Sequence, residues 1–256
     1  MDAGVDVKYE LNEIEWWAHW VEVTWLTQKT YMMQSPNFNE AFFNRAGFIA
    51  AEADWPEIIP KMEFVFEHRN LRPCVYLPVT DDFSTLGERL VARGYRITDR
   101  MSVMELRKPS FQVNPEISVE VTRPPDAKKW CEVYLRSFYG DLQLLSPTLE
   151  VVRKSMESRN VSFVSALHER SIVGTLAMYK SREIVGIFCV GTMPSFRKMG
   201  VANTVMRFAS DISKEMGATM ILQTMLSDNV ERLYLKMGLV ASYRKEVYEQ
   251  FGQPHS

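Results

Sequence analysis

The chain has 256 residues, of which 46% are hydrophobic and 24% charged, and this excludes collagen-like, low-complexity and largely disordered proteins. Its formal net charge is −2. Residues 1–115 carry 17 acidic and 12 basic side chains, and residues 116–256 carry 15 and 18. This basic excess is too small to predict a nucleic-acid-binding face, but it is compatible with an anionic ligand.

The remaining composition predicts a soluble cytoplasmic protein without a metal site. The sequence contains no apolar run of the roughly 18 residues that span a bilayer. Its first ten residues, MDAGVDVKYE, lack the basic start and apolar stretch of a signal peptide. The cysteines Cys74, Cys131 and Cys189 lie far apart and form no CxxC motif, which indicates reduced thiols rather than metal ligands.

Hydrophobic periodicity gives a first reading of residues 1–110. Ile14, Trp17, Val21 and Trp25 recur at helical spacing, so a long aromatic-rich helix is expected. Together the patterns predict helices at 11–33, 38–50 and 85–93, a strand at 72–79, and a strand or hairpin at 95–106. Gly94 is expected to end the third helix.

The polar, proline-containing segment 108–116 predicts a linker between a domain at 1–110 and a domain at 116–256. The second domain shows clearer alternation of strand and helix patterns. Strands are expected at 117–123, 183–192, 219–226 and 240–249, with a hairpin at 161–180. Helices are expected at 127–138, 149–159, 201–216 and 228–237.

The chain also shows a weak internal repeat. Residues 86–106 align with residues 230–250 at an offset of 144, with Gly94 opposite Gly238. Both segments predict a short helix, a glycine and an alternating strand. Two related domains or a chance similarity of two helix–strand units would both produce this pattern.

The segment 190–204, VGTMPSFRKMGVANT, carries the most chemical information. A buried strand is expected to end at Thr192, and a short loop with Arg197, Lys198 and Gly200 leads into an amphipathic helix. The first turn of a helix offers unpaired N–H groups, so this arrangement predicts a cradle for a pyrophosphate. The segment fits neither the Walker A nor the GxGxxG pattern, and an ordinary strand-to-helix turn is the alternative.

Two motifs in this order make the second half resemble the GNAT superfamily of acetyl-CoA-dependent N-acetyltransferases. GTMPSFRKMGVA (191–202) resembles the family's strand, Pro-x-x-Arg-x-x-Gly-x-Gly/Ala loop and helix. DNVERLYLKMGLV (228–240) resembles its Asn-x-x-x-x-Tyr-x-x-x-Gly segment. The resemblance covers residues 116–250 and implies an α+β fold. With the repeat, it implies two tandem GNAT-like domains, each a mixed, mostly antiparallel sheet flanked by helices.

The resemblance also implies where acetyl-CoA would bind. The cofactor would enter between the strands expected at 184–192 and 219–226, with Asn229 as a polar contact. Its pantetheine arm would pair with the strand end, and its pyrophosphate would meet the loop and helix start. The implied contacts are Val190, Gly191, Thr192, Arg197, Lys198, Met199, Gly200, Val201 and Ala202. Lys198–Met199 and Ala202 depart from the family's usual small-plus-basic pair and last glycine.

Tyr234 matches the family's frequent general acid, and its ordinary pKa of ~10 keeps it protonated at neutral pH. A helix tyrosine that packs against the sheet is the alternative. A backbone N–H near Val190 or Gly191 is expected to stabilise the developing oxyanion. Glu183 is the candidate base, with a solvated strand-end charge as the alternative. His168 is expected at the surface, and Cys189 is expected to be a buried side chain rather than a nucleophile.

In the first half, Leu90 stands at the position of Tyr234, and no Arg-x-x-Gly-x-Gly/Ala loop precedes it. Residues 1–110 are therefore interpreted as a degenerate, non-catalytic copy of the fold, which could form a wall of the acceptor cleft or mediate formation of a homodimer.

The leading interpretation is an N-acetyltransferase that moves an acetyl group directly from acetyl-CoA to a small-molecule or peptide amine, without a metal. A non-catalytic CoA-binding or protein-interaction module and a nucleotide-binding protein are the alternatives. Four aromatic residues of the helix at 127–138 and its end could line an acceptor site or fill the core: Trp130, Tyr134, Phe138 and Tyr139.

Overall fold

The computed structural model describes residues 5–51 and 55–251, which divide into two compact units. Unit 1 contains residues up to Val103 together with Thr224–Glu231 and the segment that begins at Ala241. Unit 2 contains Met104–Gln223 and Arg232–Val240. Within the described ranges, no helix is long and apolar enough to cross a membrane.

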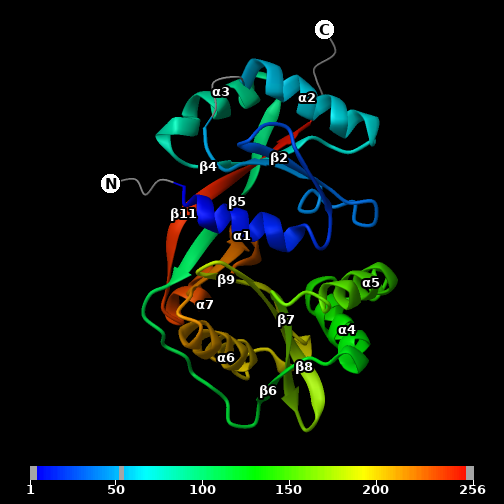
Figure 1. Cartoon of the computed structure of the whole chain (residues 1–256), viewed down its shortest axis with the longest axis vertical. Coiled ribbons are helices and arrows are strands. Elements are labelled where there is room, and N and C mark those ends of the chain that lie inside the picture. Colours follow the sequence, from blue (N-terminus) through cyan, green and yellow to red (C-terminus); the bar gives the residue numbers. More distant parts are fainter. Residues whose placement is uncertain (1–4, 52–54, 252–256) are drawn as a thin grey trace. The chain divides into compact units, whose positions relative to one another are not determined.

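Unit 1 is a mixed α+β structure (Figure 1) with the strand order β1-β2-β3-β4-β11-β5. Its helices are α1 (Val7–Trp17), α2 (Trp55–His68) and α3 (Ser84–Ala92), with a 3₁₀ turn at Asp81–Phe83. Its strands are β1 (Glu22–Trp25), β2 (Thr30–Gln34), β3 (Arg45–Phe48), β4 (Cys74–Pro78), β5 (Tyr95–Leu106) and β11 (Leu239–Gln250). The last two strands extend a few residues into unit 2.

Unit 2 has the strand order β10-β9-β8-β7-β6. Its strands are β6 (Ser118–Val121), β7 (Val161–His168), β8 (Ser171–Ser181), β9 (Ile184–Thr192) and β10 (Thr219–Met225). Its helices are α4 (Ala127–Phe138), α5 (Leu145–Ser155), α6 (Val201–Glu215) and α7 (Glu231–Lys236). Short 3₁₀ turns occupy Pro124–Asp126, Pro194–Phe196 and Leu226–Asp228.

The two main helices of unit 2 pack on opposite faces of its sheet. A Cβ built on Gly191 would lie 3.0 Å from the Cβ of Ser137 in α4, and one built on Gly174 would lie 2.5 Å from a methyl of Val201 in α6. Gly191 pairs with Thr175, the neighbour of Gly174, and adjacent strand residues face opposite sides. Helices α4 and α6 therefore enclose β8 and β9 between them.

The secondary structure expected for residues 116–250 is largely confirmed. In the first half, one expected helix is much shorter than predicted and another is absent. The helix expected at 11–33 begins at Val7, capped by Asp6, ends at Trp17 and is followed by the β1–β2 hairpin. The helix expected at 38–50 is absent, because Arg45–Phe48 forms β3 between β2 and β4. Helix α2 was not expected at all.

The internal repeat corresponds to a repeated local structure. Strands β5 and β11 both have 12 residues and begin 144 positions apart, at Tyr95 and Leu239. Each follows a helix and a glycine in the left-handed region, with φ of 85° at Gly94 and 94° at Gly238. The two aligned segments therefore adopt the same helix–glycine–strand conformation.

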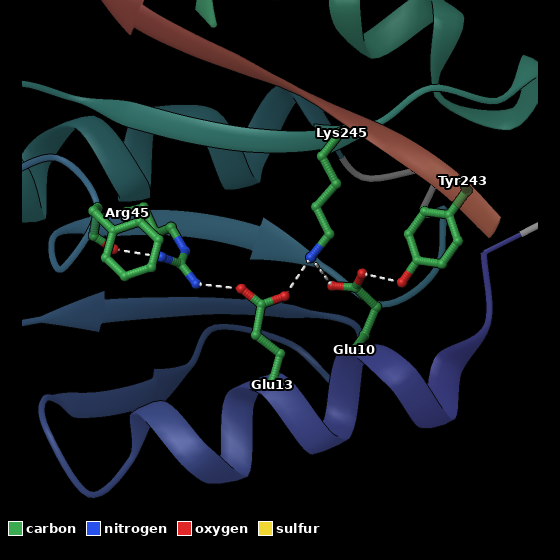
Figure 2. A network of polar contacts seen from close by, with 6 residues as sticks. Glu10, Glu13, Arg45, Tyr243 and Lys245 are labelled. Carbon is green, nitrogen blue, oxygen red and sulfur yellow. Dashed lines mark hydrogen bonds and ion pairs between the residues drawn. The ribbon is translucent and has the colours of Figure 1, made fainter. Parts of the chain in front are cut away.

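A buried ionic network lies within the core of unit 1 (Figure 2). The Lys245 ammonium on β11 contacts both Glu10 and Glu13 of α1, at 2.7 and 2.6 Å. Glu13 also accepts a 2.6 Å bond from Arg45, and Glu10 accepts a 2.5 Å bond from Tyr243. All four charged side chains are at most 1% exposed. Burial favours a raised pKa at Glu10, whereas Lys245 and Arg45 hold the pKa of Glu13 below its usual range in spite of its burial.

Candidate functional site

Strands β9 and β10 pair over only part of their length. Their parallel pairing begins with Ile184 opposite Thr219 and ends with Ile187 opposite Leu222. Strand β9 then continues to Thr192, where its register partners are on β8: Gly191 pairs with Thr175, and Thr192 with Gly174. In the described part of unit 2, the last five residues of β9 therefore have a strand neighbour on one side only. Their other backbone edge can pair with an extended ligand.

A β-bulge follows the point where this parallel pairing stops. Ala177 pairs with Phe188 and Thr175 with Gly191, so Cys189 and Val190 together stand opposite Leu176. Cys189 has a φ of 54°, a left-handed conformation that glycine usually supplies at this position of a bulge. The bulge turns the peptide groups of β9 out of the regular ladder.

Helix α6 begins without a side-chain cap in the described structure. Its N-cap is Gly200, with a φ of 78° and no side-chain cap hydrogen bond. The first helical bond to Gly200 is donated by the N–H of Thr204, at 3.0 Å. The N–H groups of residues 201–203 therefore lack partners within the helix and carry its partial positive charge. This helix start can accept an anionic group.

Residues of the segment 108–116 form hydrogen bonds with the residues around this helix start. Asn114 donates a 2.8 Å bond from Nδ2 to the carbonyl of Met199, and its own N–H bonds the hydroxyl of Thr204 at 3.1 Å. The N–H of Gln112 bonds Oδ1 of Asn203, also at 3.1 Å. Asn114 therefore shapes the site, and no local sequence signal marks it, because its partners Met199 and Thr204 lie 85 and 90 positions away.

The comparisons with known proteins agree with this arrangement. The model of the acetyltransferase (GNAT) family matches residues 127–239, which include β9, the loop and α6. Residues 127–239 form a GNAT acetyltransferase domain. No curated protein is similar enough in sequence to match the chain.

Solved structures resemble both units of the chain. A GCN5-related N-acetyltransferase from Kribbella flavida is 15% identical with a TM-score of 0.71, covering 98% of this chain and 97% of its own. One from Sphaerobacter thermophilus is 16% identical with a TM-score of 0.68, covering 89% and 82%. A tandem GNAT protein from the clavulanic acid biosynthesis pathway is 9% identical with a TM-score of 0.59, covering 78% and 70%. The expected mixed α+β fold is thus confirmed, and GNAT structures, a tandem protein among them, match most of the chain. The family model does not extend to the first half, so its interpretation as a GNAT copy stays a prediction.

Most of the predicted cofactor contacts are close in sequence and in structure within the GNAT domain. Val190, Gly191 and Thr192 end β9, and the loop Arg197–Gly200 leads to Val201 and Ala202 in the first turn of α6. The exposed Arg197 donates a 3.0 Å bond to the carbonyl of Ser137, so its side chain also ties this loop to α4. Lys198 is exposed and left-handed, with a φ of 68°.

Three other predicted residues lie outside this segment of the sequence. Tyr234 is buried in α7 and belongs to unit 2, whereas Asn229 belongs to unit 1, where its Nδ2 bonds the carbonyl of Ser227 at 2.8 Å. Glu183 is exposed just before β9 begins, and its carbonyl accepts a 2.7 Å bond from Thr219. Val190 follows Glu183 by seven positions, about 20 Å of extended chain, so Glu183 is too far from Val190 to act there directly or through a single water.

The structure also defines the surroundings of Cys189, His168 and the aromatic residues of α4. Burial raises the pKa of the Cys189 thiol, which keeps this side chain protonated and weakly nucleophilic. His168 ends β7, and its ring lies 5.4 Å from the ring of Phe196 in the loop. Among the α4 aromatics, Trp130 and Tyr134 are buried, whereas Phe138 is 53% exposed. The part of the chain that the structure describes holds no cluster of three or more metal-ligating side chains.

The left-handed Cys189 gives a stability prediction. Cys189→Gly and Cys189→Ala remove the same sulfur, but only glycine adopts a positive φ without strain. The glycine variant is therefore expected to be more stable by about 1 kcal/mol. At an ordinary strand position the order is reversed. Urea unfolding of the two variants checks this, and greater stability of the alanine variant would contradict the left-handed assignment.

Proposed function

We propose that the GNAT domain transfers an acetyl group from acetyl-CoA to an amine by direct attack. The observation that carries this proposal is the partial pairing of β9 and β10, followed by the uncapped start of α6. The first feature offers a free strand edge to the amides of a pantetheine arm. The second offers unpaired N–H groups to the pyrophosphate.

In this mechanism the neutral amine nitrogen attacks the thioester carbon, and the carbonyl electrons move to the oxygen. The N–H of Val190, at the bulge, donates to that oxygen as it becomes negative. The intermediate then expels the CoA thiolate, Tyr234 gives it a proton, and water takes the proton that the amine loses. The products are the acetylated amine and CoA. Solvent returns a proton to Tyr234.

We also propose that residues 1–110 form the non-catalytic part of the protein. Leu90, which stands 144 positions before Tyr234, is fully buried and has no ionisable group. The matching helix–glycine–strand segments support a common origin of the two halves. The test is a CoA-bound structure, in which CoA is expected in the GNAT domain and absent from the first half.

The test of the function is a two-part measurement on the full chain. Calorimetry with acetyl-CoA is expected to show binding, and release of free CoA thiol is expected with at least one member of a panel of amino acids, polyamines and peptide N-termini. Binding without thiol release on any acceptor would favour a CoA-binding module. The place of Glu183 at the far end of β9 is the observation in favour of that second candidate.

Tyr234→Phe is expected to lower kcat by about 100-fold or more, because the hydroxyl acts on the leaving thiolate. The dissociation constant of acetyl-CoA is expected to stay the same. Tyr179→Phe is the matched control, since it removes another buried tyrosine hydroxyl, from β8. Equal turnover of the Tyr234→Phe and wild-type proteins would exclude Tyr234 from the mechanism.

A further inference from the structure

The β-bulge of β9 is held by one side chain of the neighbouring strand. The hydroxyl of Thr175 on β8 donates a 2.9 Å hydrogen bond to the backbone carbonyl of Cys189, the left-handed residue of the bulge. Thr175 is completely buried. A non-glycine residue keeps a left-handed conformation only where its surroundings favour it, and this bond is such a restraint.

The bond also fixes the direction of the next N–H group. The peptide between Cys189 and Val190 is planar and trans, so its carbonyl and its N–H point in opposite directions. The Cys189 carbonyl points to Thr175 on β8. The N–H of Val190 therefore points away from the hydroxyl of Thr175, at a position where β9 has already left its ladder with β10.

The absence of a side chain at position 191 leaves room for this hydroxyl. A Cβ on Gly191 would lie 2.8 Å from Oγ1 of Thr175 and 3.0 Å from the Cβ of Ser137 in α4. The hydroxyl is thus enclosed between β9 and α4, and it has a carbonyl acceptor within the same small space. Thr175, Cys189 and Gly191 form one local arrangement.

We propose that Thr175 is a positioning residue for acetyl transfer. Its hydroxyl orients the Cys189–Val190 peptide so that the N–H of Val190 donates to the thioester carbonyl of acetyl-CoA. The inference rests on the proposed function, which supplies the acetyl donor. Since the donor is aligned before the reaction, it stabilises the oxyanion more than the ground-state carbonyl, and loss of alignment lowers kcat more than it weakens binding.

The test compares three variants of the full chain. Thr175→Val replaces the hydroxyl with a methyl of similar size. Thr175→Ala removes the hydroxyl and the methyl of threonine, so it cannot overfill the space. Thr175→Ser keeps the hydroxyl. The measured quantities are kcat and the dissociation constants of CoA and of acetyl-CoA. CoA lacks the thioester carbonyl, so the ratio of the two constants reports on the Val190 contact even without turnover.

The hydroxyl-free variants are expected to lose about 10- to 100-fold in kcat, somewhat less than removal of a direct oxyanion donor. They are expected to bind acetyl-CoA several-fold more weakly and CoA unchanged, and Thr175→Ser is expected to restore both values. If Thr175 had only a structural role, the hydroxyl-free variants would bind CoA and acetyl-CoA more weakly by the same factor, or Thr175→Ser would lower kcat as much as they do. Either result overturns the proposal. So does a kcat close to that of the wild type in the hydroxyl-free variants.

The two levels of the proposal fail differently. A wild-type protein that binds neither CoA nor acetyl-CoA would reject the proposed function, and the role of Thr175 with it. A wild-type protein that binds both but acetylates no amine would reject the transfer reaction and the role of Thr175 in it. The ratio of dissociation constants would then still show whether Thr175 orients the N–H of Val190 toward the thioester.

Discussion

Replacement of Lys245 by methionine is expected to destabilise unit 1 by about 3–5 kcal/mol, because it leaves buried carboxylates without their cation. Lys245 lies within 2.7 Å of Glu10 and 2.6 Å of Glu13, and all three side chains are 1% exposed. The control is Arg207→Met, which breaks an ion pair with Asp211 between side chains that are 55% and 50% exposed. That change is expected to cost less than about 0.5 kcal/mol.

The same variant is expected to depend on pH in a defined direction. Burial already raises the pKa of Glu10, and Lys245 opposes that effect. Without Lys245, the folded state binds the proton of Glu10 more strongly than the unfolded state does. Stability from such a group is present at low pH and lost as the pH rises. Thermal unfolding is therefore expected to show a smaller deficit of Lys245→Met at pH 5 than at pH 8, and a deficit independent of pH would contradict it.

Gly238→Ala is expected to destabilise unit 2 by at least about 3 kcal/mol, through backbone strain and a direct clash. Gly238 has a φ of 94°, and an added Cβ would lie 1.7 Å from the carbonyl oxygen of Lys108. The carbonyl of Gly238 also accepts bonds from the N–H groups of Arg107 and Lys108, at 3.1 and 3.0 Å. The chain therefore cannot move aside without losing those bonds.

Gly217→Ala is the matched control for this substitution. Gly217 also has a positive φ, of 61°, but an added Cβ would have no neighbour within 4 Å. Only the left-handed strain remains there, and the expected cost is about 1–2 kcal/mol. Midpoints of urea unfolding compare the two variants. Similar midpoints would show that the contact with Lys108 adds nothing to the strain.

Local sequence patterns predicted the elements correctly where hydrophobic spacing and helix-start residues agreed with the final packing. Helix α4 matches its expected range, 127–138, because its apolar spacing and the prolines before it point to the same start. The helices predicted for the first half were wrong for a physical reason. Trp16, Trp17 and Trp20 continue an aromatic run past the end of α1, and side-chain packing rather than helical periodicity buries Trp20.

The site was predictable only in part. The loop and the helix start could be located because glycine and basic residues mark them locally. The bulge carried no such signal, because cysteine rather than glycine occupies its left-handed position. The hydroxyl that holds it, on Thr175, is 14 residues away in β8, whose residues 173–179 are all buried, so no local pattern distinguishes it. The ionic network joins residues more than 230 positions apart, which no local pattern encodes.

The pairing of β11 with β4 has a consequence for synthesis on the ribosome. Lys245–Glu249 of β11 pairs with Cys74–Pro78 of β4, so the sheet of unit 1 gains this strand only after all the residues between them have been translated. At about 5–20 residues per second, the nascent first half waits on the order of ten seconds with one edge of β4 open and Glu10 and Glu13 lacking Lys245. Such an edge can pair with strands of other chains, so aggregation of the nascent protein is favoured during this interval.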